Sequence, residues 1–138
     1  MNPIEHFIHT WTETESGTKQ AFSELYKHLK TLDDITLDFN ERPGVSFSLR
    51  PRHKSQKTRS LFAMVDVIDD NPDERWLSVC FYGEMVTDPD EAGDLIPEGL
   101  LGEDGYCFDL SEYDEDGIRY LKDRLSEAHE NSKELCCK

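Results

Sequence analysis

The sequence predicts an α+β fold, in which an antiparallel sheet of about five strands carries two or three helices packed mainly on one face. Three observations lead to this prediction. Apolar residues recur at helical spacing near both ends of the chain, and at every second residue in the stretches between. Short polar turns join most of those stretches. Strands with short connections pair antiparallel, and the helices then cover one face of their sheet.

The length and composition favour one packed domain. The chain has 138 residues, which is an ordinary length for a single domain. Hydrophobic residues make up 36% of it and gather in periodic runs, which is typical of a folded chain rather than a disordered one. We therefore expect one domain over residues 1–138, with a helical segment at 1–17 and a flexible tail at 132–138.

Two helices are predicted before the first strand. Asn2 and Pro3 suit the start of a short helix, which carries apolar residues up to Trp11. After the break "TETESG", a longer amphipathic helix follows over residues 18–32. One face of this second helix is apolar and consists of Phe22, Leu25, Tyr26, Leu29 and Leu32.

Five stretches have the composition of strands. Residues 35–39, 45–49, 75–82 and 106–110 alternate apolar and polar side chains, whereas residues 60–68 are apolar on both faces, as in a central strand. Residues 83–104 show no strong period and contain four glycines and two prolines, so we expect a long excursion there. Ser111 suits the cap of a final helix that ends near Asn131.

The charge distribution is strongly acidic and excludes some partners. Thirty acidic residues against fifteen Lys and Arg give a formal charge of −15, which disfavours nonspecific binding to nucleic acids and anionic membranes. No apolar run approaches the roughly 20 residues of a membrane span. The N-terminus lacks the features of a signal peptide. We therefore expect a cytoplasmic protein without a membrane partner.

Residues 18–132 resemble a family of small bacterial domains of unknown function, sometimes labelled "predicted transport protein". The resemblance lies in the helix "TKQAFSELYKHL", the strands "LFAMV" and "WLSVCF", and the ending "GYCFDLSEYDEDGIRYLKDRLSEAHENS". It implies the same order of helices and strands. It implies no catalytic residue and no cofactor, because the family has no established ones. The first segment, residues 1–17, lies outside the resemblance.

A basic segment at residues 50–59 is the first candidate site. It holds a third of the positive charge of the chain: Arg50, Arg52, Lys54, Lys57 and Arg59. Arginine offers a planar fork for phosphate oxygens, so this segment is a candidate anion-binding loop. It contains no aromatic residue to stack on a base, which disfavours nucleic acid. Alternatively, these bases neutralise five acids that a meander brings to the same end of the sheet: Glu84, Asp88, Asp90, Glu91 and Asp94.

The outer face of the sheet is the second candidate. If Leu61, Val65 and Leu77 point towards the helices, alternation turns another set of side chains outward. That set comprises Phe62, Met64, Trp76 and Tyr82. Exposed aromatic patches are typical of contacts between proteins. Alternatively, the 83–104 excursion or the N-terminal segment folds over this face.

No catalytic or metal site is predicted. Residues 88–99 only partly match a calcium loop, because Ala92 and Gly99 replace expected ligands. His6 and His9 share a helical face but lack a third ligand. Cys80 and Cys107 are expected to be small buried side chains, and Cys136 and Cys137 exposed thiols of the tail. We therefore expect a protein-binding or self-association module, such as a homodimer, with an anion or nucleic-acid binder as the alternative.

Overall fold

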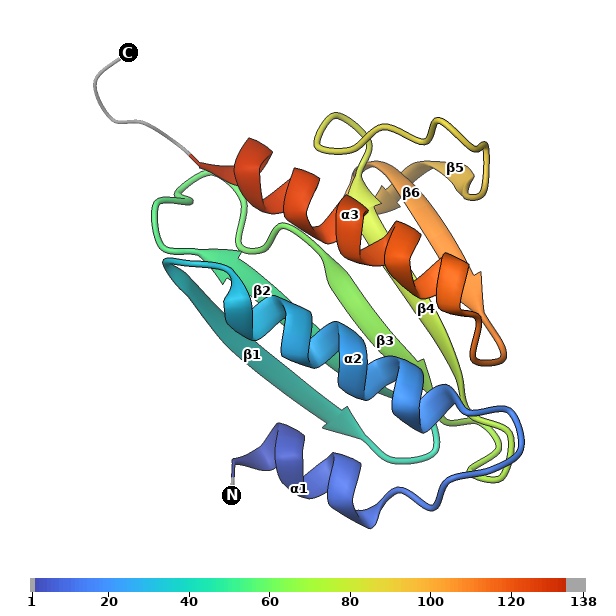
Figure 1. The fold of residues 1–138 in the computed structure, drawn as a ribbon. Coiled ribbons are helices and arrows are strands. Elements are labelled where there is room, and N and C mark those ends of the chain that lie inside the picture. Colours follow the sequence, from blue (N-terminus) through green and yellow to red (C-terminus); the bar gives the residue numbers. More distant parts are fainter. Residues whose placement is uncertain (1, 134–138) are drawn as a thin grey trace.

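The computed structural model describes residues 2–133 and shows an α+β fold, a six-stranded antiparallel sheet with three helices (Figure 1). The helices are α1 (Pro3–Thr10), α2 (Thr18–Thr31) and α3 (Glu115–Ser132). The strands are β1 (Ile35–Arg42), β2 (Ser46–His53), β3 (Met64–Ile68), β4 (Trp76–Tyr82), β5 (Asp94–Leu100) and β6 (Glu103–Leu110). The fold class predicted from the sequence is confirmed. The tail predicted at 132–138 lies largely outside the described residues.

The strands lie in the order β1-β2-β3-β4-β6-β5, and every neighbouring pair is antiparallel. The sequence analysis did not identify β5, which lies within the predicted excursion. All residues of β5 except Leu100 are exposed, and the strand contains Pro97 and Gly99. Such an edge strand buries too little apolar surface to show the alternation that predicts a strand.

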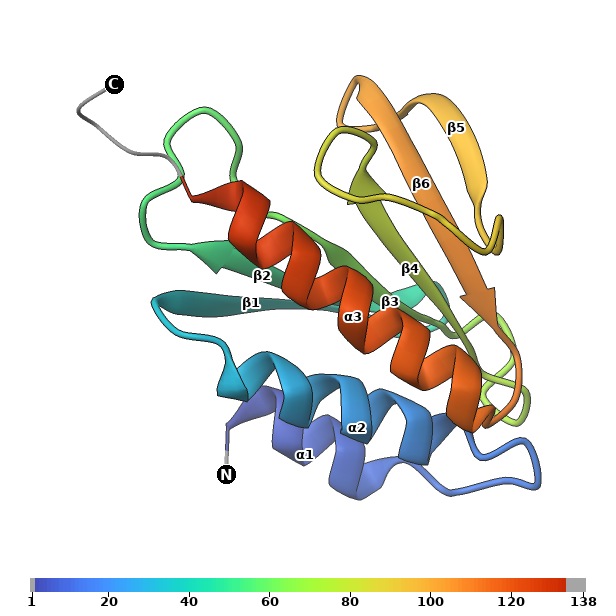
Figure 2. The ribbon, with the colours of Figure 1, turned by 45° about the horizontal axis from the view of Figure 1, so that its top comes forward.

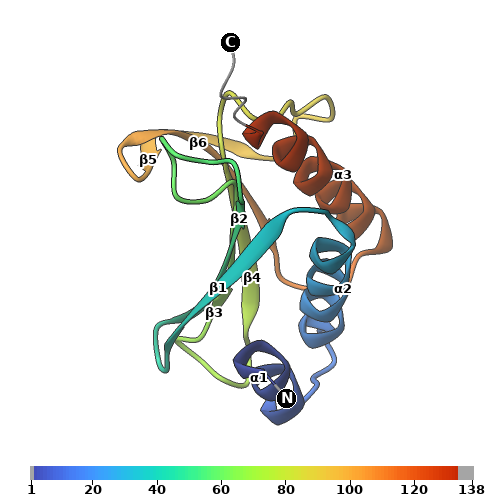
Figure 3. The same ribbon diagram turned by 90° about the vertical axis from the view of Figure 1, so that its left-hand side faces the viewer.

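All three helices lie on one side of the sheet, and no helix covers the other side (Figure 3). Helices α2 and α3 run side by side across the sheet (Figure 2). Leu25 of α2 and Leu125 of α3 are fully buried, as are Val65 and Val79 of the central strands. The hydrophobic core therefore lies between the helices and one face of the sheet.

The N-terminal helix α1 covers the helical side of the first two strands. The Asn2 side chain accepts a hydrogen bond of 2.8 Å from the Glu5 amide, and Pro3 follows it at the helix start. The ring of Phe7 stacks on Phe47 of β2 with centroids 4.2 Å apart. This segment therefore does not fold over the outer face of the sheet.

The segment between β4 and β5 is anchored to α3. The amide and hydroxyl of Thr87 each donate to the Glu127 carboxylate at 2.9 Å. The Asn131 side chain donates to the Met85 carbonyl at 2.8 Å. The segment therefore packs beside the helix (Figure 1) and, like α1, leaves the outer face of the sheet open.

The basic segment has different boundaries from those expected. Strand β2 continues to His53, so Arg50 and Arg52 belong to a strand, and the connection to β3 spans residues 54–63. Pro51 lies inside the strand, where it pairs with Leu37 of β1. Among the described residues, no helix is both long and apolar enough to cross a membrane.

Candidate functional site

No helix covers the sheet face opposite α1, α2 and α3, although Arg59 of the 54–63 connection lies over the Tyr82 end of this face. Residues directly opposite each other on neighbouring antiparallel strands point to the same side. Leu49, Val65, Val79 and Phe108 form a buried row towards the helices. The residues that alternate with them form what we call the uncovered face: Asp38, Arg42, Ser48, Arg50, Arg52, Met64, Asp66, Ile68, Trp76, Ser78, Cys80, Tyr82, Asp94, Cys107 and Asp109.

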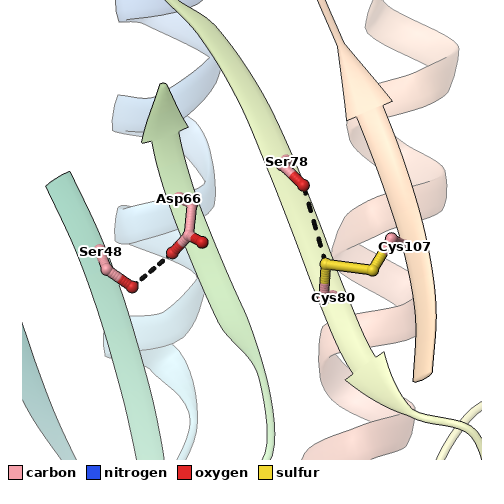
Figure 4. Close-up of a disulfide and its surroundings, with 5 residues drawn as sticks. All are labelled: Ser48, Asp66, Ser78, Cys80 and Cys107. Carbon is pink, nitrogen blue, oxygen red and sulfur yellow. Dashed lines mark hydrogen bonds between the residues drawn. A yellow bond between two sulfur atoms is a disulfide. The ribbon is translucent and has the colours of Figure 1, made fainter. Parts of the chain in front are cut away.

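A carboxylate lies at the centre of the uncovered face (Figure 4). Asp66 of β3 accepts a short hydrogen bond from the hydroxyl of Ser48, its neighbour on β2. The side chain of Arg50 donates to the same hydroxyl at 3.2 Å. Burial disfavours the charged form and raises the pKa of Asp66, although Ser48 and Arg50 oppose the shift. The centre of the face is therefore polar and partly desolvated.

A disulfide between Cys80 and Cys107 lies beside this carboxylate (Figure 4). The two residues are direct partners in the β4–β6 register, with Cα atoms 4.1 Å apart. Both are half-buried on the uncovered face. The expectation that both are small buried side chains is therefore wrong, because they are half-buried and bonded to each other. The pairing could not be predicted, because β5 lies between the two strands in the chain and the register that aligns them was unknown.

Large apolar side chains flank the polar centre. Ile68 and Trp76 are opposite neighbours on β3 and β4, and both are half-buried. Met64, which lies opposite Cys80, is half-buried as well. The uncovered face therefore carries apolar contact surface at both ends of its two central strands.

Phe62 does not belong to this face. It lies before β3, because that strand begins only at Met64, and its side chain is fully buried. Its ring centroid is 5.7 Å from that of His129 on α3. The alternation of the strand does not extend back to Phe62, which explains why the sequence analysis placed it on the wrong side of the sheet.

Tyr82 points to the uncovered side but is covered by Arg59, whose guanidinium lies 4.4 Å from the ring centroid. Arg59 also forms ion pairs with Glu84 and Glu103. Burial and Glu103 raise the pKa of Tyr82, whereas Glu103, followed by Glu84, raises that of Arg59. An open hollow of about 560 Å³ adjoins this cluster. Tyr82 is therefore not available to a partner in this conformation.

The five basic residues of the 50–59 segment do not converge on one site. Arg50 contacts Ser48, whereas Arg52 donates to the Gln56 carbonyl at 2.9 Å. Arg59 is held by Glu84 and Glu103, so one of the five acids expected near this segment is its partner. Lys54 and Lys57 are exposed. These contacts favour internal neutralisation of Arg59 over an anion site built from all five side chains.

The charges of the uncovered face are unevenly distributed. Strands β1 and β2 carry Arg42, Arg50 and Arg52 on this face and one acid, Asp38. Strands β5 and β6 carry Asp94 and Asp109 and no base, since residues 76–118 contain neither Lys nor Arg. One half of the face is therefore basic and the other half acidic.

A buried histidine pair lies on the helical side of the sheet and was not predicted. His53 ends β2 and His129 lies near the end of α3, with ring centroids 5.3 Å apart. The His53 ring nitrogen Nδ1 accepts a hydrogen bond of 3.0 Å from the Ser55 amide. Burial, and then His129, lower the pKa of His53. Nothing in the sequence links two histidines 76 positions apart.

The remaining candidates do not form a metal site within residues 2–133, where no group of three His, Cys, Asp or Glu side chains is arranged to hold a metal ion. Asp88 accepts hydrogen bonds from the amides of Ala92 and Gly93 and from the Tyr120 hydroxyl. These partners occupy the carboxylate that would begin the calcium loop. His6 and His9 are exposed on α1. Cys136 and Cys137 lie outside the described residues.

Comparison with known proteins adds nothing to this description. No family model, no curated protein and no solved structure matches the chain. The resemblance to the bacterial domains of unknown function therefore stays a prediction.

Proposed function

We propose that the protein is a self-association module, in which two copies pair through their uncovered faces. The observation that supports this proposal is the division of one open sheet face into a basic half and an acidic half around an apolar and polar centre. Such a face is complementary to a second copy of itself. Symmetric dimers use the same patch on both subunits, so self-complementarity is what they require.

One alignment of two copies brings their unlike charges together. A two-fold axis between the two faces, parallel to the strands and centred between β3 and β4, places β2 of one copy over β6 of the other. Arg50 then lies above β6 of the partner, level with Cys107 and two residues along the strand from Asp109, and the same contact occurs twice. Complementary charges of this kind set the orientation and the rate of association more than its strength.

The centre of the face would supply the affinity. Met64, Ile68 and Trp76 lie on the two strands next to the axis, where they would meet their counterparts in the partner. Large apolar and aromatic side chains at the middle of an interface account for most binding energy. Phe62 and Tyr82, which the sequence analysis included, are covered in the monomer and are not part of this proposal.

Light scattering after size-exclusion chromatography tests the proposal. We expect a dimer that weakens at least about tenfold in Trp76→Ala, since buried tryptophans at interfaces contribute roughly 2 kcal/mol or more. Leu101→Asn is the matched control, because Leu101 is 60% exposed in the turn between β5 and β6. A monomer at every concentration tested, or a dimer indifferent to Trp76→Ala, overturns the proposal.

A charge exchange tests the alignment. Arg50→Glu and Asp109→Arg should each weaken the dimer, because each brings like charges near each other where β2 lies over β6 of the partner. The double variant Arg50→Glu/Asp109→Arg should restore it, since the two-fold axis exchanges both contacts at once. If the double variant is as weak as the sum of the single ones, the two faces do not align in this way.

A further inference from the structure

The disulfide between Cys80 and Cys107 joins two strands that are already paired over their whole length. Strand β4 pairs with β6 at six positions, from Leu77 opposite Leu110 to Tyr82 opposite Gly105. The cysteine pair lies in the middle of this ladder. Backbone hydrogen bonds on both sides of the bridge therefore hold the strands together whether or not the sulfur atoms are bonded.

The bridge lies where an external thiol can approach it. Both cysteines point away from the helices, and neither the N-terminal segment nor the segment after β4 covers them. Both side chains are half-buried, whereas Val79 and Phe81, which alternate with Cys80, are completely buried. Reagents can reduce such an exposed disulfide in the folded protein, whereas a disulfide sealed in a core is resistant to reduction.

We propose that Cys80 and Cys107 form a reversible thiol–disulfide exchange site, which low-molecular-weight thiols reduce in the folded protein. The reductant thiolate attacks the Cys107 sulfur, a mixed disulfide forms, and the bond to Cys80 breaks. The electron pair of that bond leaves with the Cys80 sulfur as a thiolate, which then takes a proton. A second thiol releases Cys107 from the mixed disulfide. The two thiols supply two electrons and become one disulfide.

The neighbour of Cys80 determines which sulfur leaves. The Ser78 hydroxyl lies 3.7 Å from the Cys80 sulfur (Figure 4). A disulfide sulfur carries no hydrogen, so the hydroxyl is the donor in this contact. The same hydroxyl stabilises the negative charge that develops on Cys80 when the bond breaks. Among the hydrogen bonds that the structure gives, Cys107 has no such donor.

The charge around the bridge selects the thiol. Asp94 of β5 lies directly opposite Cys107. Asp109 lies two residues from Cys107 along β6. Strands β4, β5 and β6 carry no Lys or Arg, and Arg59, which lies over Tyr82 two residues from Cys80, is paired with Glu84 and Glu103. Negative charges within about 8 Å of the bridge repel anionic thiols and attract cationic ones. A thiol with an amino group and no carboxylate is therefore the preferred class of reductant.

A reversible site also agrees with the location that the sequence analysis expects. Disulfides in the cytoplasm are rare, and those that form there are usually transient and respond to the redox state. The proposal does not depend on self-association, because a monomer presents the same bridge to solvent.

Differential alkylation of the folded protein tests the proposal. The full chain with Cys136→Ser and Cys137→Ser leaves only the two cysteines of the bridge. The oxidised protein is treated with cysteamine or with 3-mercaptopropionate, quenched with N-ethylmaleimide and weighed by mass spectrometry, while circular dichroism monitors the fold. We expect two adducts in folded protein. The ratio of the rate with cysteamine to the rate with 3-mercaptopropionate should be several-fold higher than the same ratio for a small uncharged disulfide, which corrects for the different thiolate fractions of the two reagents. The double variant Asp94→Asn/Asp109→Asn should lose this preference.

Two results would overturn the proposal. Adducts that form only in denaturing urea would show that the bridge is a sealed structural disulfide. Adducts on both cysteines before any reductant is added, in protein exposed to oxidised glutathione, would show that the pair does not form a disulfide. A rate ratio of the two thiols equal to that for the small uncharged disulfide would remove the role of Asp94 and Asp109 and overturn the selection of the thiol.

Discussion

The guanidinium of Arg59 lies over the ring of Tyr82, 4.4 Å from its centroid, and its nitrogens pair with the carboxylates of Glu84 and Glu103. Glu84 follows β4 and Glu103 begins β6. The Arg59 side chain, from the connection between β2 and β3, therefore links the ends of two other strands. The Tyr82 side chain keeps only 2% of its surface exposed as a result.

Removal of Arg59 should therefore destabilise the fold more than removal of another base from the same connection. We expect Arg59→Gln to cost about 1–2 kcal/mol, mostly from the lost contact with the Tyr82 ring, because ion pairs with exposed carboxylates contribute little. Lys54→Gln is the matched control and should change the stability by less than about 0.5 kcal/mol. Urea denaturation of both variants measures the difference, and equal midpoints would contradict this role of Arg59.

The raised pKa of Asp66 predicts a dependence of stability on pH. A carboxyl whose pKa is higher in the folded state than its ordinary value of 3.8 stabilises the fold below that value, and this contribution is lost as the pH rises through the folded pKa. Asp66→Asn cannot ionise, so its stability relative to the wild type should rise between about pH 4 and about pH 7. Urea denaturation at both pH values checks the trend. Asp109→Asn is the matched control, because Asp109 is exposed on the same face two strands away, and it should show no such rise.

The sequence predicted the helices and five of the six strands because each of them buries one face. Phe22 and Leu29 recur at helical spacing, and Leu77 and Val79 alternate with Ser78. Strand β5 was not predicted, because its only buried residue is Leu100. It is held by hydrogen bonds to β6, and backbone pairing leaves no trace in the side-chain pattern.

The candidate site was predictable only in part, for a related reason. Alternation alone correctly predicted that Met64 and Trp76 point away from the helices, since both lie within regular strands. It failed for Phe62, which precedes its strand, and it could not reveal that Arg59 covers Tyr82. The pairing of Cys80 with Cys107 depends on the register between β4 and β6, which the intervening β5 separates in sequence.

The buried histidine pair predicts a loss of stability in mild acid. The pKa of His53 is lowered from 6.5. Its contribution to the free energy of unfolding is therefore present above that value and is lost as the pH falls towards the folded pKa. Asp33, Asp34 and Lys133 also lie near this ring, and burial and His129 outweigh the two acids. The wild type should therefore lose stability between about pH 7.5 and about pH 5.5, and His53→Gln should lose less.

The change in the free energy of unfolding with pH, compared between the wild type and His53→Gln, separates the effect of His53 from that of the other histidines. Burial also lowers the pKa of His28, so part of the wild-type slope remains in His53→Gln. His9→Gln is the matched control, because His9 is exposed on α1, and it should keep the full slope. A slope in His53→Gln equal to that of the wild type would assign the acid sensitivity to groups other than His53.

Reduction of the disulfide should lower the stability of the protein without unfolding it. The bridge closes a loop with a sequence separation of 27 residues. On the loop-entropy account, such a bridge destabilises the unfolded chain by about 3.5 kcal/mol. Urea denaturation of oxidised and reduced protein in the Cys136→Ser/Cys137→Ser background measures the difference. Equal stabilities would mean that oxidation strains the folded sheet by as much as it restricts the unfolded chain.

The two proposals together predict that association protects the disulfide. Cys80 and Cys107 lie on the uncovered face, so a dimer formed through that face encloses them and excludes the reductant. The rate of reduction by cysteamine should therefore fall as the protein concentration rises through the dimer dissociation constant. In Arg50→Glu, which should stay monomeric at the same concentrations, the rate should be constant. A constant rate in the wild type, over a range where light scattering shows dimers, would mean that the copies pair through another surface and leave the bridge open.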